Sequence, residues 1–327
     1  MLTVPEIDNI ARGFMAARIL LTGVELDLFG QLGESELNAQ ELADLLKTDP
    51  RGTEILCDAL VSLDILTKEE GKYRNTPTSL KYLSSRSTRF RGGGLRHMAH
   101  LWQSWSRLTE VVQKGGPELG PWSDEKREAF IQAMEHHAKG VAEQTVKVLD
   151  LSGAKRMLDM GGGPGAFAIA LVKENSNLEA VVLDLPYALN IARKAIEEAG
   201  LSTRITLKEG DFFKDDLGGP YDMVLLSSII HSMDEEENHF LLNRAKEALN
   251  PGGLLVIRDF LVDASHTEPQ QAAVFAVNML VNTRGGRTYS YEEISGWLKE
   301  LGFLNIEWKD LDGPSKLVLG IKECEKT

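Results

Sequence analysis

A glycine-rich segment between two apolar runs constrains this 327-residue chain more than any other feature. Residues 158–165 read Leu-Asp-Met-Gly-Gly-Gly-Pro-Gly, and the apolar run 166–172 follows them. Glycine allows a sharp backbone turn and lets a ligand approach where a Cβ would collide. The first N–H groups of a following helix have no partners within that helix. The segment therefore predicts a strand, a loop that holds a small charged cofactor, and a helix.

Two classes of cofactor fit this loop. The spacing Gly161-x-Gly163-x-x-Ala166 matches a dinucleotide fingerprint, and Asp184 lies at a workable distance for a ribose. Asp159, just before the loop, favours the other class, because its carboxylate would repel a pyrophosphate and attract a cation. Both interpretations predict a parallel α/β sheet, and the residues downstream separate them.

Four further segments follow in order along the chain. They are a strand ending in Asp184-Leu185-Pro186, a strand ending in Gly210-Asp211-Phe212-Phe213, a strand running into His231, and Pro251-Gly252-Gly253 before a buried strand. With the glycine-rich segment, this order resembles the class I S-adenosylmethionine-dependent methyltransferases. More narrowly, it resembles the small-molecule O-methyltransferases that include plant phenolic, acetylserotonin and bacterial polyketide enzymes. The resemblance covers nearly the whole chain.

The resemblance implies an α/β fold in which a Rossmann-like methyltransferase domain, with a mostly parallel seven-stranded sheet, follows an N-terminal α-helical winged-helix dimerisation domain. We predict the dimerisation domain in residues 1–91, a helical linker that contributes to the substrate pocket in 92–150, and the catalytic domain in 151–327. The alternation of strands and helices itself predicts a parallel sheet with right-handed crossovers. Residues 305–309 and 315–321 are expected to form its antiparallel edge.

The N-terminal part has the pattern of helices followed by a wing. Asn38 and Glu41 are placed to form a capping box, and Pro50 is suited to begin the next helix. Residues 65–74 are typical of a β-hairpin with a charged turn. Beyond the hairpin, the three glycines at 92–94 are typical of a hinge.

Because winged helices often bind DNA, a regulator with a cofactor-sensing domain is the alternative from another class. The helix after Pro50 carries one basic residue, Arg51, against Glu54, Asp58 and Asp64, and the whole chain has a net charge of −13. Nucleic-acid affinity rests largely on phosphate neutralisation, so we expect no nucleic-acid partner. In the resembled family this unit dimerises, which implies a homodimer formed through apolar faces.

The positions of the cysteines and histidines argue against a disulfide and against a metal site. Cys57 and Cys324 lie far apart without metal-ligand spacing and are typical of reduced thiols. We see no signal peptide and no membrane-spanning run, and therefore expect a cytoplasmic protein without a membrane partner. We expect no metal, because no acid completes a ligand set with the clustered histidines His97, His100, His136 and His137.

The resemblance implies that S-adenosyl-L-methionine is the cofactor, with S-adenosyl-L-homocysteine as product. The implied cofactor residues are Asp159, Gly161, Gly163, Gly165, Asp184, Leu185, Asp211, Phe212 and Ser227. Asp184 would accept hydrogen bonds from both ribose hydroxyls, and Asp211 with Phe212 would hold the adenine. Ser227 stands where many relatives carry a lysine. Structural alternatives stay open, since a strand-end aspartate often caps a helix and Phe212 could be a core residue.

Methyl transfer to a phenol benefits from a base, because a phenol ionises only near pH 10. His231 matches the family's catalytic histidine, and Asp259 matches a carboxylate that would orient it as in a triad. A second family acid is missing, because Gly286 precedes the Arg-Thr pair, and Met233 replaces the family's tryptophan. Methylation of carbon or sulfur, or other chemistry with the same cofactor, therefore remains an alternative.

The acceptor pocket is expected to lie among the long helices predicted for 97–112 and 124–149 and the inserted helix at 272–281. Its candidate residues are Trp102, Trp105, Met134, Met233, Phe275, Met279 and Asn282. Met134 and Met279 match positions that line the acceptor in relatives, and Asn282 is suited to hydrogen-bond a substrate oxygen. A core role is the alternative for Met134 and both tryptophans. The resemblance implies a small aromatic hydroxyl compound as the acceptor, and no motif identifies that compound.

Overall fold

The computed structural model describes residues 1–121 and 123–324, apart from the side chains of Asp124, Glu125, Glu135, His136, His137 and Lys139. The chain divides into two compact units. The first comprises Met1–Trp102 with Ser123–Ala133, and the second comprises Gln103–Trp122 with Met134–Thr327. The predicted division into three parts, with boundaries after residues 91 and 150, is not tested by these two units and stays a prediction.

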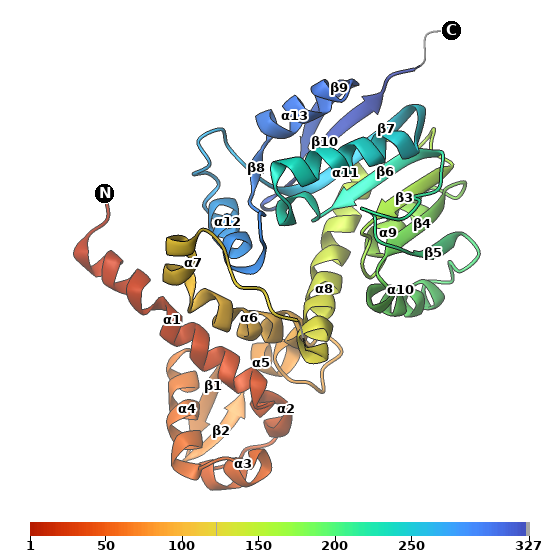
Figure 1. Ribbon diagram of the computed structural model, residues 1–327. Coiled ribbons are helices and arrows are strands. Elements are labelled where there is room, and N and C mark those ends of the chain that lie inside the picture. Colours follow the sequence, from red (N-terminus) through yellow and green to blue (C-terminus); the bar gives the residue numbers. More distant parts are fainter. Residues whose placement is uncertain (122, 325–327) are drawn as a thin grey trace. The chain divides into compact units, whose positions relative to one another are not determined.

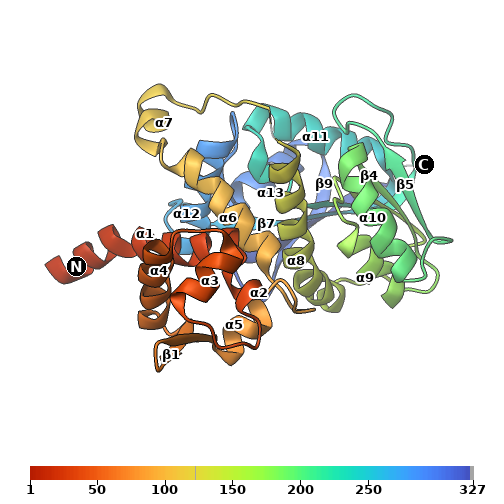
Figure 2. The same cartoon turned by 90° about the horizontal axis from the view of Figure 1, so that it is seen from below.

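The first unit consists of helices packed around a β-hairpin (Figures 1 and 2). The predicted capping box is present, because Asn38 accepts a 2.9 Å hydrogen bond from the Glu41 N–H and Glu41 accepts one of 2.8 Å in return. The predicted hairpin is also present, with antiparallel strands. Its elements are α1 (Val4–Glu25), α2 (Leu28–Leu32), α3 (Ala39–Leu46), α4 (Pro50–Ser62), β1 (Leu66–Glu69), β2 (Lys72–Asn75), α5 (Pro77–Tyr82) and most of α6 (Gly92–Trp105).

The first half of α1 carries apolar side chains that its own unit does not cover. The core of the unit lies elsewhere, around Phe29, Leu42 and Tyr73, whose side chains have no exposed surface. Ile10, by contrast, is 70% exposed. Both views show the N-terminal turns of α1 extending beyond α2–α5 (Figures 1 and 2).

The expected hinge at residues 92–94 is wrong, because these glycines form the first turn of α6. A Cβ on Gly92 would lie 1.9 Å from the ring of Phe90, and a Cβ on Gly93 would lie 2.6 Å from the Cβ of Gln132. Close packing therefore explains glycine at both positions. The helix expected over 97–112 is also interrupted, since α6 ends at Trp105 and α7 (Leu108–Lys114) follows.

The second unit is built on one twisted sheet with the order β5-β4-β3-β6-β7-β10-β9. The first five strands pair in parallel, β10 is antiparallel to both of its neighbours, and the short β8 pairs with β7 outside this path. The expected mostly parallel sheet with an antiparallel edge is thus confirmed. The strands are β3 (Arg156–Met160), β4 (Glu179–Asp184), β5 (Ile205–Glu209), β6 (Tyr221–Ser227), β7 (Leu249–Val262), β8 (Tyr289–Ser290), β9 (Phe303–Asp310) and β10 (Ser315–Lys322).

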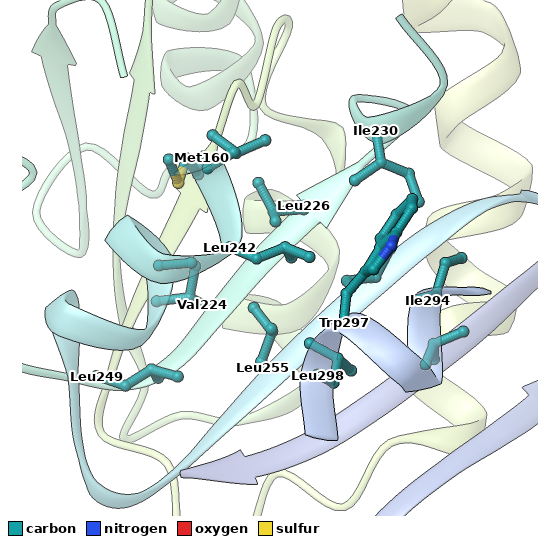
Figure 3. Packing of buried hydrophobic residues seen from close by; sticks show 14 of the residues in the cluster. Met160, Val224, Leu226, Ile230, Leu242, Leu249, Leu255, Ile294, Trp297 and Leu298 are labelled. Carbon is teal, nitrogen blue, oxygen red and sulfur yellow. The ribbon is translucent and has the colours of Figure 1, made fainter. Parts of the chain in front are cut away.

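Helices cover both faces of this sheet, because its strands are apolar on both sides. On one face, the C-terminal half of α8 (Asp124–Val148) packs with α9 (Ala166–Glu174) and α10 (Pro186–Glu198). On the other, Leu242 of α11 (Glu235–Ala248) and Trp297 of α13 (Tyr291–Glu300) pack against Leu226 and Leu255 (Figure 3). Within the described residues, no helix is both long and apolar enough to cross a membrane.

Candidate functional site

The carboxyl ends of four adjacent strands meet at one edge of the sheet. β3 runs into the glycine loop (residues 161–165), β4 ends at Asp184, β5 is followed by Asp211, and β6 ends at Ser227. Open α/β sheets bind their ligands at this edge. The structure therefore brings together polar residues that lie far apart in the sequence.

The glycine loop lies directly against side chains that follow two other strands. A Cβ on Gly161 would lie 2.5 Å from Cδ1 of Ile229 and 3.3 Å from Cε1 of Phe212. Gly161, Gly163 and Gly165 have φ angles of 73°, 53° and 75°, which L side chains rarely adopt. Ile229 was not among the expected site residues, although its place just beyond a strand end was a usable signal.

Asp159 lies beneath the loop and has no exposed surface. Its carboxylate accepts a 3.3 Å hydrogen bond from the Ala168 N–H, and its other oxygen has no partner among the described residues. Burial raises the pKa of Asp159 to about 7, the Ala168 N–H opposes the rise, and the charge of Asp184 adds to it. Asp159, expected as a cofactor contact, thus supports the loop from inside the fold rather than from the surface a ligand would meet.

Asp184 closes the loop from the neighbouring strand. Its two oxygens accept hydrogen bonds of 2.7 Å from the N–H groups of Gly163 and Leu185. A carboxylate offers about four acceptor positions, so about two remain for hydroxyl donors. Burial raises the pKa of Asp184, and the two N–H groups oppose the rise. Asp184 is not the helix cap that a strand-end aspartate often provides, because the N-cap residue of α10 is Leu185.

Asp211 and Phe212 follow β5 at the same edge. Asp211 accepts a 2.9 Å hydrogen bond from the Phe213 N–H and pairs with Lys214 at 2.9 Å, and these contacts, Lys214 first, lower the pKa of Asp211. Phe212 is half-buried and packs partly against the core, with its ring 5.1 Å from that of Phe213. Ser227 is half-buried at the end of β6.

His231 and Asp259 are in hydrogen-bond contact just beyond β6 and near the carboxyl end of β7. His231 lies in η1 (Ile230–Ser232), and its Nδ1 is 2.5 Å from Oδ1 of Asp259, whose other oxygen accepts the His231 backbone N–H at 3.4 Å. The Asp259 side chain is 1% exposed and that of His231 is 12% exposed. A carboxylate at Nδ1 favours a proton there, which leaves Nε2 as the acceptor nitrogen. Nε2 makes no hydrogen bond to any described residue.

The segment around Gly286 has no room for the acid that the family pattern would place there. A Cβ on Gly286 would lie 2.4 Å from the carbonyl oxygen of His231 and 2.5 Å from Oγ1 of Thr283. Met233, expected in the acceptor pocket, is 7% exposed and belongs to the core cluster with Trp297. Its packing explains why this chain has methionine there, and a place for Met233 in the acceptor pocket remains a prediction.

One face of α12 (Gln270–Asn282) joins the histidine to a polar network. The ring of Phe275 meets His231 edge-on, with centroids 4.9 Å apart at 85°. Further along, Asn278 accepts a 2.9 Å hydrogen bond from the indole of Trp105 and one of 3.0 Å from the amide of Asn282. Asn278 was missed in the sequence, although it lies three and four residues from expected positions on one helix face.

The remaining pocket candidates are less closely connected to this site. Met279 is 7% exposed, and Met134 is half-buried in α8. Trp102 belongs to the first unit, where its ring lies 6.2 Å from that of Phe14 and 5.7 Å from the guanidinium of Arg18. These three positions therefore remain predictions.

In the part of the chain that the structure describes, no group of three or more His, Cys, Asp or Glu side chains could hold a metal ion. His97 packs edge-on against Phe130 at 5.4 Å. The side chains of His136 and His137 lie outside the described residues. The absence of a metal remains a prediction.

Comparison with known proteins gives two family matches and several relatives of similar length. Residues 105–304 match the O-methyltransferase domain, and residues 9–85 match the O-methyltransferase dimerisation domain. The chain is 33% identical over 326 residues to 3-hydroxy-5-methyl-1-naphthoate 3-O-methyltransferase of Streptomyces sahachiroi, covering 96% of this chain and 94% of that protein.

Two further comparisons bear on the acceptor and the cofactor. The N,N-dimethyltransferase OxyT of Streptomyces rimosus is 30% identical over 309 residues, covering 90% of this chain and 89% of that protein. The crystal structure of human N-acetylserotonin methyltransferase in complex with SAM matches with a TM-score of 0.85 at 26% identity, over 97% of this chain and 96% of that one.

Proposed function

The chain belongs to the family of S-adenosylmethionine-dependent O-methyltransferases, and from this premise we propose that it methylates a hydroxyl group of a small aromatic molecule. We assign His231 as the general base and Asp259 as the residue that orients it. The observation that supports this assignment best is the 2.5 Å contact between Nδ1 and Oδ1, with Nε2 left unbonded among the described residues.

The strand-end residues fit S-adenosylmethionine. Nothing lies within 4 Å of the position that a Cβ on Gly163 would take, so the loop presents bare backbone there. Asp184 keeps acceptor positions for ribose hydroxyls, and Phe212 offers a half-buried ring to the adenine. Asp211, beside Phe212, keeps its negative charge at neutral pH because its pKa is lowered. When bound, this cofactor supplies a methyl group on a positively charged sulfur.

His231 would remove the proton that a neutral phenol keeps at physiological pH. A phenol ionises near pH 10, so a base close to the hydroxyl assists its attack on the methyl carbon. Nε2 of His231 accepts that proton, while Nδ1 retains its own proton in the contact with Asp259. The negative charge of Asp259 then stabilises the imidazolium. Phe275 restricts the imidazole ring through its edge contact.

An aromatic acceptor suits the surroundings of Nε2. Phe275 contacts His231 and also packs against Phe260 with centroids 4.5 Å apart, which provides an apolar surface for a flat molecule. Asn282 uses its amide nitrogen on Asn278, so its own amide oxygen remains as an acceptor for a polar substituent. Relatives are named for a hydroxynaphthoate and for acetylserotonin, which are both aromatic.

We also propose a homodimer formed through the first unit. The match to the dimerisation domain and the exposed apolar residues on α1, such as Ile10, support this assembly. The chain has a net charge of −13, which disfavours binding to the phosphates of DNA. Dimerisation is therefore the better supported role of the hairpin-containing unit.

The test measures release of S-adenosylhomocysteine across a panel of phenols, with aromatic amines and thiols included because one relative is named as an N,N-dimethyltransferase. His231→Ala is expected to lower turnover of the preferred phenol by about 10²- to 10⁴-fold, the usual contribution of a general base. Affinity for S-adenosylhomocysteine, measured by calorimetry, should stay unchanged.

His239→Ala is the matched control, because this histidine lies on α11 and contacts Trp297 rather than Asp259. It should retain full turnover. Equal rates for His231→Ala and the unaltered protein would refute the role of the base. Turnover only with amines or thiols would refute the hydroxyl acceptor.

A further inference from the structure

Arg258 is a buried cation on β7, immediately before Asp259. Its residue is 7% exposed, and its Cα pairs in register with Ser227 at the end of β6. Successive residues of a strand point to opposite faces, so Arg258 lies on the other side of the sheet from Asp259 and its contact with His231. Both residues stand at the edge where the glycine loop and Asp184 are gathered.

The partners of the Arg258 guanidinium are two neutral hydroxyl groups and an aromatic ring, because its Cζ lies 5.6 Å from the centroid of Phe260. Nη1 donates to the hydroxyl of Ser228, and Nη2 donates to the hydroxyl of Ser315. Ser228 follows β6 and Ser315 begins β10, so the guanidinium is held toward the carboxyl end of β7. Nε is buried and has no hydrogen-bond partner among the described residues.

Among the described residues this guanidinium forms no salt bridge, although burial of a charge without an opposite charge is costly. Burial lowers the pKa of Arg258, and the negative charge of the adjacent Asp259 opposes that change. Three of the five guanidinium N–H groups, including the one on Nε, donate to no group among the described residues. The side chain thus keeps donors and positive charge at the end of the sheet where ligands bind.

We propose that Arg258 binds the carboxylate of a reactant. This inference rests on the proposed function and deepens it, because a planar guanidinium fork matches a carboxylate with two parallel hydrogen bonds. Two reactants can bring that group: the amino-acid end of the cofactor, or an acid substituent on the aromatic acceptor. Ser228 and Ser315 hold two nitrogens, and the remaining donors, including Nε, take the ligand.

The experiment compares two pairs of probes that differ only by the acid group. One pair is S-adenosylhomocysteine and its decarboxylated analogue, and the other is 3-hydroxy-2-naphthoate and 2-naphthol. Affinities are measured by calorimetry on the full-length protein and on Arg258→Gln and Arg258→Lys. We expect Arg258→Gln to weaken the acid member of one pair by about 10- to 100-fold, as for loss of a charge-assisted hydrogen bond, and to leave its acid-free partner unchanged.

The pair that responds identifies the source of the carboxylate, and Arg258→Lys should retain part of the affinity because it keeps the charge. Arg156→Gln is the matched control, because Arg156 is exposed at the opposite end of its strand, over the Tyr221 ring, and should bind all four probes normally. If Arg258→Gln fails to fold, Arg258→Lys and the unaltered protein's own preference for the acid members decide the question.

Selective loss of an acid member supports the proposal, and every other pattern overturns it. Equal loss of both members of a pair would mean that Arg258 only maintains the strand end. No loss in either pair would mean that the guanidinium meets no ligand. If the unaltered protein fails to bind S-adenosylhomocysteine, the proposed function falls as well, whereas normal binding without selective loss overturns this inference alone.

Discussion

Gly161→Ala tests whether the glycine loop is closed against the neighbouring strand ends. Two costs add at this position. A φ of 73° costs an L residue about 1–2 kcal/mol. The new Cβ would also lie 2.5 Å from Cδ1 of Ile229 and 3.3 Å from the Phe212 ring, and such overpacking costs about 1–3 kcal/mol. The expected loss in the free energy of unfolding is therefore about 2–5 kcal/mol.

The neighbouring glycines separate the two costs. Gly163 has a φ of 53° and nothing within 4 Å of its Cβ position, so Gly163→Ala should lose only the backbone cost of about 1–2 kcal/mol. Gly162 lacks a positive φ, but its Cβ would lie 2.6 Å from Cγ of the buried Asp159, so Gly162→Ala should lose only the packing cost of about 1–3 kcal/mol.

Urea denaturation of the three variants measures these losses, and calorimetry with S-adenosylhomocysteine measures their effect on binding. Gly161→Ala should also weaken binding by at least about tenfold, because relief of the overlap displaces Phe212 and Ile229 by more than the geometry of a site tolerates. Equal losses of stability for Gly161→Ala and Gly163→Ala would refute the reasoning, since the close approach to Ile229 would then carry no energy.

Three further predictions concern other parts of the molecule. Folded Asp159 holds its proton up to a pH of about 7, because burial raises its pKa, whereas an unfolded aspartate releases the proton near the ordinary pKa of 3.8. This group therefore makes the free energy of unfolding fall as pH rises between those two values. Asp159→Asn should flatten this pH dependence in urea denaturation, and an unchanged dependence would contradict a raised pKa for the buried carboxyl group. In Gly286→Ala the new Cβ would lie 2.4 Å from the carbonyl oxygen of His231 and should displace that residue. Turnover should fall by about tenfold or more while the affinity for S-adenosylhomocysteine stays unchanged. Normal turnover would show that the segment around Gly286 moves without disturbing His231. Ile10→Asp should convert a dimer to monomers in light scattering, because Ile10 is 70% exposed on α1, and an unchanged mass would place the interface elsewhere.

Local patterns accounted for most of the secondary structure and for the strand-end residues. The capping box at Asn38, the hairpin at residues 65–74 and the loop at Gly161 depend on residue types at fixed short spacings, and such spacings are visible in a single sequence. The prediction failed at residues 92–94, where one pattern had two explanations. Glycines suit a hinge as well as a tight contact, and only the structure shows that Gly92 packs against Phe90 and Gly93 against Gln132.

The chain's own order of strands, acids and glycines determined the sheet, its ligand-binding edge and the family, because alternating apolar strands and helices allow few topologies. The tertiary structure alone decided which side chains meet at that edge. It set the 2.5 Å contact of His231 with Asp259, buried Asp159 and Met233, left no space at Gly286, and held Arg258 between two hydroxyls. These contacts join residues that are distant in sequence, and their energies depend on burial and distance, which no local spacing encodes.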